Sequence, residues 1–132
     1  MHMPIQSVWD DTHCSILRTT HIGIWTWGEL QAHDENVVLP MLRSVDHPVA
    51  MIVDLRRAFW VMPGSIIRNL QAQIDRYADG NVDIVVFVST KEAVRSLLVT
   101  VHHRYGLFDR HYCTASSMAE ARQTIQNMRR RN

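Results

Sequence analysis

The chain has 132 residues, of which 46% are hydrophobic and 20% are charged. A chain of this length and balance folds as one globular domain, residues 1–132, and is not disordered. Its net charge of +1 gives no overall field that would attract nucleic acid or an anionic membrane surface.

Two cysteines, Cys14 and Cys113, stand far apart in the chain. Neither belongs to a Cys-x-x-Cys pair, so two reduced thiols are expected rather than a disulfide framework. The N-terminus begins Met-His-Met-Pro and has no apolar stretch of the kind that a signal peptide needs. No apolar run approaches the length of a membrane span. We therefore expect a cytoplasmic protein.

The first third of the chain predicts short strands followed by a helix. β-Branched and aromatic residues indicate strands at Gln6–Trp9, Cys14–Thr19 and His21–Trp27, separated by short polar turns. An apolar stripe at helical spacing then predicts a helix within Leu30–Ser44. Pro40 falls inside this helix and should kink it or remove one backbone hydrogen bond.

The middle of the chain alternates strands with a helix. Val49–Val53 is a continuous apolar run, and Val82–Val88 is apolar except for Asp83, as in strands that are covered on both faces of a sheet. Between them, Ser65–Asp79 has a regular apolar face and predicts the best-defined helix of the chain. This helix should end at the turn Asp79-Gly-Asn81.

The last third carries two more helices, each with its own start signal. Ser89-Thr-Lys-Glu92 reads as a capping box, and Gly106 ends the helix that follows. A short strand around His111–Cys113 leads to a second capping box, Ser117-Met-Ala-Glu120. The element order therefore predicts an α/β fold: a mixed sheet of about five strands with an N-terminal hairpin, parallel inner strands and four helices.

Most of the functional information lies in Ala50–Ser65. This stretch reads as a buried strand with a carboxylate, Asp54, at its carboxyl end, then a ten-residue loop and a helix N-terminus. Ligands and partners approach α/β sheets at the carboxyl ends of the strands, and a helix N-terminus adds unpaired N–H groups. The candidate site comprises Asp54, Arg56, Arg57, Phe59, Trp60, Ser65 and Arg68.

Each of these residues also has a structural interpretation. Asp54 could bind a cation or a ribose, but an aspartate there more often bonds the N–H groups of the following loop or pairs with a nearby arginine. Ser65 could accept a phosphate, but its position also suits an N-cap residue. For both residues the structural role is favoured. Phe59 and Trp60 either form an exposed interface patch or fold down over the end of the sheet, and both interpretations stay open.

Two stretches give the chain a resemblance to a known family. Ile52-Val-Asp-Leu55, with the loop and the helix from Ser65, is similar to the strand ending in Asp-Leu before the phosphorylation motif of STAS domains. Cys113-Thr-Ala-Ser-Ser-Met-Ala-Glu-Ala121 resembles the closing strand and Ser-x-x-Glu-Ala helix start of the same family. STAS domains form sulfate-transporter tails and anti-sigma-factor antagonists. The resemblance runs from about Cys14 onward and implies a STAS-like fold and a docking role in signalling.

The chain departs from the family at the phosphorylation motif. The Asp-Ser-Ser-Gly tetrapeptide of the family corresponds here to Met62-Pro63-Gly64-Ser65, so the acidic residue and the phosphorylatable serine are replaced. The remaining hydroxyl, on Ser65, is displaced to the helix start. The resemblance therefore implies a divergent STAS-like domain that lacks the phosphorylation switch of the family.

The favoured hypothesis is a non-catalytic bacterial signalling domain that docks a protein partner, or a second copy of itself, through Leu55–Arg68. The alternative is a small-molecule domain, in which the arginines and the helix N-terminus hold the anionic group of a nucleotide or lipid in a strand-end crevice. The two hypotheses predict different surface shapes. A docking loop leaves an exposed aromatic patch, whereas a binder needs an enclosed cavity, here lined by Trp25 and Trp60.

Other chemistries find little support in the residue pattern. The eight histidines are scattered, and the adjacent His102 and His103 would point about 100° apart on a helix, so no metal site is expected. A Gly-rich phosphate loop, a nucleophile elbow and an HExxH motif are absent from the sequence, and we expect neither an enzyme nor a cofactor. Arg129–Arg131 complements the negative end of the last helix dipole and otherwise reads as a solvated tail.

Overall fold

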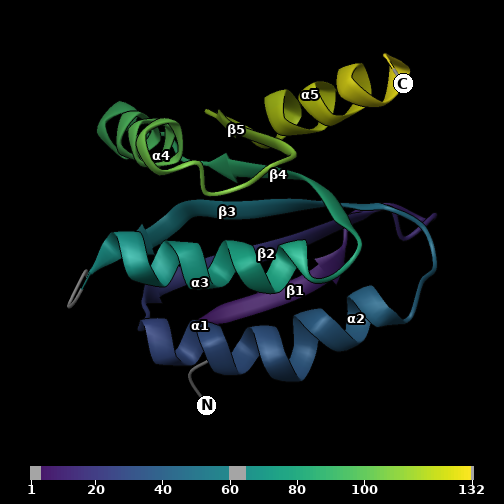
Figure 1. The fold of residues 1–132 in the computed structure, drawn as a ribbon, viewed down its shortest axis with the longest axis horizontal. Coiled ribbons are helices and arrows are strands. Elements are labelled where there is room, and N and C mark those ends of the chain that lie inside the picture. The colour runs from purple at the N-terminus through teal and green to yellow at the C-terminus, as the bar shows by residue number, and fades with distance from the viewer. Residues whose placement is uncertain (1–3, 60–64, 132) are drawn as a thin grey trace.

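The computed structural model describes residues 4–59 and 65–131, and they form one mixed five-stranded sheet with helices on both faces (Figure 1). The sheet order is β1-β2-β3-β4-β5. β1 runs antiparallel to β2, and the other neighbours are parallel. The strands are β1 (Ile5–Trp9), β2 (Ile16–Ile24), β3 (Val49–Phe59), β4 (Val82–Val88) and β5 (His111–Ala115). The predicted fold class, a hairpin followed by parallel strands, is confirmed.

Three helical segments, α1, η1 and α2, follow one another without a break and form the first of four helices. The helical segments are α1 (Trp27–His33), η1 (Asp34–Val38), α2 (Leu39–Arg43), α3 (Ile66–Ala78), α4 (Glu92–Tyr105) and α5 (Met118–Arg130). Within residues 4–59 and 65–131, none of these helices is long and apolar enough to cross a membrane.

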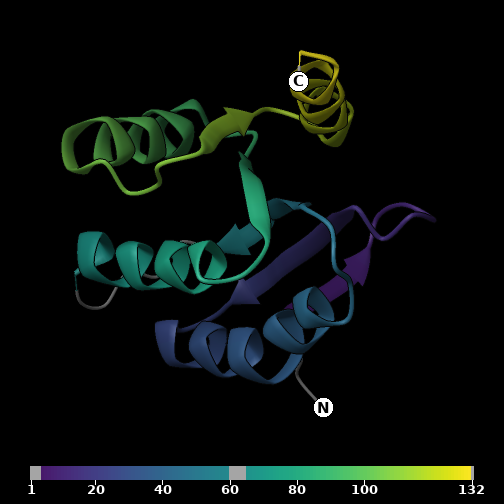
Figure 2. The ribbon, with the colours of Figure 1, turned by 45° about the vertical axis from the view of Figure 1, so that its right-hand side comes forward.

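The helices are divided unequally between the two faces of the sheet. The first helix, α3 and α4 cover one face, and α5 lies alone on the other (Figure 2). The larger core contains Leu42, Ile74 and Leu98 against the odd-numbered side chains of β3, while Ile125 of α5 packs against the other face of the sheet. The two apolar runs are therefore buried on both sides, as predicted for β3 and β4.

The first helix begins earlier than the sequence indicates. The expectation of separate strands at Cys14–Thr19 and His21–Trp27 with a turn between them is wrong, because β2 runs without a break from Ile16 to Ile24. β2 ends at Ile24, and Trp27 is the first helical residue because Thr26 and Glu29 form a capping box. The helix contains one π turn, in which the N–H of Leu39 donates to the carbonyl of Asp34. This irregularity lies next to Pro40, whose missing N–H and ring disfavour a regular α-helical turn there.

β3 is longer than the sequence indicates. The loop predicted from Leu55 onward is wrong as far as Phe59, because β3 continues to that residue. Its extension pairs with the second half of β2, where Gly23 faces Ala58 in the register. Backbone N–H and C=O groups paired in this way are stable as strand even where the side chains are polar. Asp54 consequently lies inside the strand and not at its end.

The structure can be compared with the predicted start and end of α4 and with the predicted start of α5. The capping box predicted at Ser89 is wrong: Lys91 is the N-cap of α4, and Ser89 is buried, with its N–H bonded to the carbonyl of Ala115 at the end of β5. Gly106 ends α4 in the left-handed conformation, as expected. Ser117 caps α5 through the N–H of its third helical residue, which confirms that helix start.

Candidate interaction surface

The carboxyl ends of β2 and β3 present an exposed apolar pair. Ile24 and Phe59 are neighbours in the parallel register, and they are 60% and 62% exposed. Arg56 and Arg57, just before Phe59 on β3, are exposed as well. Of the two interpretations for the aromatic residues, exposure holds for Phe59, whereas Trp60 lies outside the described residues.

Asp54 is buried, and its carboxylate is fully engaged by Arg56. Oδ1 accepts from the Arg56 N–H at 3.1 Å and from Nε at 2.9 Å, and Oδ2 accepts from Nη2 at 2.9 Å. Burial raises the pKa of Asp54, but these bonds outweigh it and leave the pKa below the ordinary value. The pairing confirms the structural interpretation, and it holds the first arginine of the surface in place.

Asp54 and Arg56 can meet because residues two apart on a strand point to the same face of the sheet. The pairing of β2 with β3 shifts between Thr20 and Ile22, opposite the segment Asp54–Arg57. Such a bulge locally bends a strand and increases its twist. The bulge has no signature in the sequence, whereas the sequence predicts that Asp54 pairs with a nearby arginine.

Ser65 has the structural role expected from its position. Its Oγ accepts from the N–H of Arg68 at 3.2 Å, as in an N-cap. Its carbonyl oxygen accepts from the side chain of Asn69 at 2.8 Å. Arg68 itself is exposed on the first turn of α3. The structure therefore places the described candidate residues at the end of β3 and the start of α3, with residues 60–64 outside the description.

A second charge cluster, which the sequence did not indicate, joins β1 to α5. Asp10 accepts from Arg18 at 3.0 Å and from two nitrogens of Arg122 at 2.8 and 2.9 Å. The Asp10 side chain is only 4% exposed, and the hydrogen bonds from Arg122, opposed by burial, lower its pKa. Arg122 lies 112 residues further along the chain, so only the folded structure brings the partners together.

The C-terminal arginines are not simply a solvated tail. Arg129 donates to Oγ of Ser15 at 3.0 Å and to its carbonyl oxygen at 2.7 Å. The interpretation as a tail is therefore wrong for Arg129, whose side chain ties α5 to the turn between β1 and β2. Arg130 and Arg131 remain exposed.

A row of polar side chains lies beneath α1. Oγ of Ser7 is 2.7 Å from Oγ1 of Thr19 and 2.7 Å from Nε2 of His33. His21, close by, is buried, and neither ring nitrogen has a hydrogen-bond partner among the described residues. Desolvation lowers the pKa of His21 to about 3, so the ring is neutral at physiological pH. The row resembles a nucleophile beside a base, yet among the described residues no carboxylate bonds to His33 to orient it.

The remaining residues with possible chemistry are Trp25, the two cysteines and candidate metal ligands. Trp25 is 2% exposed and packs edge-on against His21 and Trp27, with ring centroids 4.6 and 4.8 Å away. Both cysteines are free, and burial raises the pKa of Cys113 to about 11. Within the described part of the chain, no group of three or more His, Cys, Asp or Glu side chains could hold a metal ion.

No family model, curated protein or solved structure matches the chain. The class of the protein is thus given by its fold, a single-sheet α/β domain with an N-terminal hairpin and parallel inner strands.

Proposed function

We propose that this protein is a cytoplasmic, non-catalytic bacterial signalling domain of the STAS-like type. It docks a protein partner, or a second copy of itself, through the segment Leu55–Arg68, and it works without a phosphorylation switch. The observation that carries the proposal is the exposed apolar pair of Ile24 and Phe59 beside Arg56 and Arg57.

The residue types favour a protein partner. Aromatic residues and arginine are enriched where protein interfaces bury their central contacts, and lysine is depleted there. Burying a phenylalanine side chain is worth roughly 1.5–3 kcal/mol. Phe59 is 62% exposed, so most of this free energy remains to be gained when a partner covers it.

The backbone supports the same proposal. Arg57 and Phe59 lie on a strand that is paired along β2 rather than on a free loop. Their positions are therefore set before a partner arrives, and less conformational entropy is lost on association. The bonds between Asp54 and Arg56 add a further constraint.

The small-molecule alternative has less support. It needs an enclosed cavity lined by Trp25 and Trp60, but Trp25 packs edge-on against His21 and Trp27, and Trp60 lies outside the described residues. A thermal-shift screen of nucleotides and fatty acids addresses this alternative, since a ligand at a hundred times its Kd adds about 2.7 kcal/mol of stability.

The test is partner capture from the native bacterial host by the full chain, with chemical crosslinking, and sedimentation equilibrium for self-association. The variant Phe59→Ala with Arg57→Glu should weaken capture or self-association by about tenfold or more, which corresponds to about 1.4 kcal/mol. Tyr105→Ala is the matched control, because Tyr105 is an aromatic residue on α4 that is 49% exposed and remote in sequence. Equal capture by both variants would contradict the proposal.

A further inference from the structure

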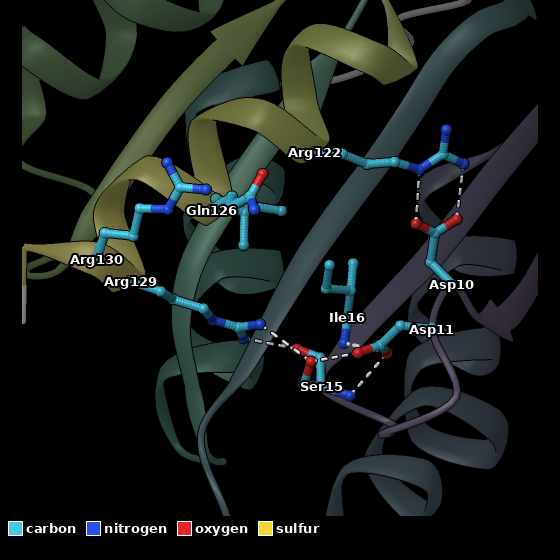
Figure 3. A pocket seen from close by; sticks show the side chains of 9 residues that line it. Asp10, Asp11, Ser15, Ile16, Arg122, Gln126, Arg129 and Arg130 are labelled. Carbon is cyan, nitrogen blue, oxygen red and sulfur yellow. Dashed lines mark hydrogen bonds and ion pairs between the residues drawn. The ribbon is translucent and has the colours of Figure 1, made fainter.

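A concave region lies at the other end of the sheet. A groove of about 560 Å³ runs between α5 and the turn that joins β1 to β2 (Figure 3). This turn precedes the first residue of β2, so the groove sits at the amino ends of the parallel strands, away from Phe59. Its volume is within the range of small-molecule sites, roughly 300–1,000 Å³.

Two arginine contacts span the groove. At one end Arg122 bonds Asp10, and at the other Arg129 bonds Ser15, as the dashed lines in Figure 3 show. Seven residues of helix separate the two arginines, which corresponds to about 10 Å along the axis of α5. The space between the contacts is therefore about as long as a small organic molecule.

The wall opposite α5 is held rigidly. One carboxylate oxygen of Asp11 accepts from the N–H groups of Ser15 and Ile16 at 2.8 and 3.0 Å, and the other accepts from Oγ of Ser15. Cys14, inside the turn, has a φ of 53°, a conformation that non-glycine residues rarely adopt. Because these bonds fix the turn, the groove is largely formed before anything binds.

The groove combines an apolar floor with an excess of positive charge. Ile16 and Ile125 supply apolar surface between the two arginine contacts. Three arginines and two aspartates line the groove, which leaves one excess positive charge, and Asp10 is shared by Arg18 and Arg122. Arg130 also lines the groove and has no ion pair among the described residues, which leaves cationic groups available.

We propose that this groove binds a small organic anion, namely a carboxylate or phosphate with a short apolar body. The anionic group lies toward Arg129 and Arg130, where charged N–H donors form the stronger class of hydrogen bond. The amide of Gln126 adds a neutral donor, and the apolar body lies over Ile16 and Ile125. The site is independent of the docking surface at the end of β3.

The test uses a fluorescent aromatic sulfonate, 1-anilinonaphthalene-8-sulfonate, titrated onto the folded full chain and then displaced by three competitors. Octanoate and octyl phosphate distinguish the two anionic groups, and octanol carries the same apolar body without charge. We expect saturable one-to-one binding in the micromolar range. At least one anionic competitor should displace the probe about tenfold more strongly than octanol does.

Two variants alter the groove without touching the contacts that span it. Arg130→Glu reverses a lining charge, and Gln126→Trp fills the space, since both residues line the groove and are exposed. Arg131→Glu and Gln123→Trp make the same chemical changes on exposed residues outside the lining and serve as matched controls. Circular dichroism and thermal melts verify that all four variants fold.

The expected result is a loss of affinity of about tenfold in both groove variants and of less than about twofold in both controls. Three results would each overturn the proposal: no saturable binding up to millimolar probe, displacement by octanol as strong as by the anions, or equal affinity in groove and control variants. Since Phe59 lies outside the groove, Phe59→Ala should leave probe binding unchanged whether or not the docking proposal holds.

Discussion

Arg76 of α3 forms two hydrogen bonds with the buried carboxylate of Asp34 in the first helix. Nε and Nη2 of Arg76 lie 3.0 and 2.7 Å from Oδ2, and the Asp34 side chain is fully buried. The hydroxyl of Tyr77 donates to Oδ1 at 3.2 Å. Asp34 belongs to the π turn next to Pro40. Its bonds to Arg76 and Tyr77 therefore connect the irregular turn of the first helix to α3.

Asp34 should make the protein more stable in mild acid. Burial raises its pKa to about 6 against the contributions of Arg76 and Tyr77. In the unfolded chain this carboxyl has its ordinary pKa of 3.8, so between about pH 6 and pH 4 the folded state binds more protons and its free energy of unfolding rises as pH falls. Asp34→Asn removes this gain, and urea unfolding at several pH values measures it.

For Asp34→Asn, the quantity to compare with the wild type is the slope of the free energy of unfolding against pH. Over the same range the variant should lose stability on acidification more steeply than the wild type, by up to about 1.4 kcal/mol per pH unit. Parallel curves for the two proteins would show that Asp34 does not titrate there. At neutral pH the neutral amide also weakens the contact with Arg76, which shifts the curve without changing its slope.

His21 should make the protein less stable in acid, which is the opposite of the effect of Asp34. Its pKa falls to about 3 in the folded state because of burial, from 6.5, so in acid the unfolded state binds more protons and stability is lost as pH falls. His21→Leu should therefore gain stability relative to the wild type, by roughly 1.4 kcal/mol for each pH unit below 6.5. His33 and His102, whose pKa values burial also lowers, add the same sign.

The matched control for His21→Leu is His111→Leu, because His111 is exposed on β5. Urea unfolding of both variants at neutral pH and in mild acid separates the buried ring from a general effect of losing a histidine. A His21 variant that follows the wild type throughout the acid range would mean that the ring gains a proton without unfolding.

Ser65 should contribute to stability as a helix cap. Ser65→Ala removes the acceptor of the Arg68 N–H and should lower the free energy of unfolding by about 1 kcal/mol. Ser65→Asn restores a side-chain acceptor and should recover most of the loss. If the alanine and asparagine variants unfold at the same urea concentration, the cap contributes nothing measurable.

Ser65 should also remain unphosphorylated in its native host. Its hydroxyl already accepts the Arg68 N–H, and a phosphate would replace that bond with a bulky dianion. If the proposed resemblance to STAS domains holds, their acidic and phosphorylatable residues correspond to Met62, Pro63 and Gly64, none of which offers a hydroxyl. Intact mass spectrometry of the purified native protein measures this, and a stoichiometric phosphate on Ser65 would contradict it.

Local signals predicted the features that depend on neighbours in the sequence. The segment Val82–Val88 became β4 with the same bounds, because six apolar residues among seven suit a position covered on both faces. Ser65 begins α3 and Gly106 ends α4 as expected, since a cap needs only the adjacent turn. The pairing of Asp54 with an arginine also follows from its immediate surroundings.

The sequence by itself therefore determined the element order and the fold class, because hydrophobic periodicity and capping act over a few residues. Tertiary structure decided the rest. β3 reached Phe59 because β2 paired with it, and Ser89 bonds the end of β5 instead of capping α4, because Ala115 accepts its N–H. The groove beside α5 exists because Arg129 meets Ser15 across 114 residues. Such contacts leave no local pattern, since their free energy arises only when the chain has already brought distant segments together.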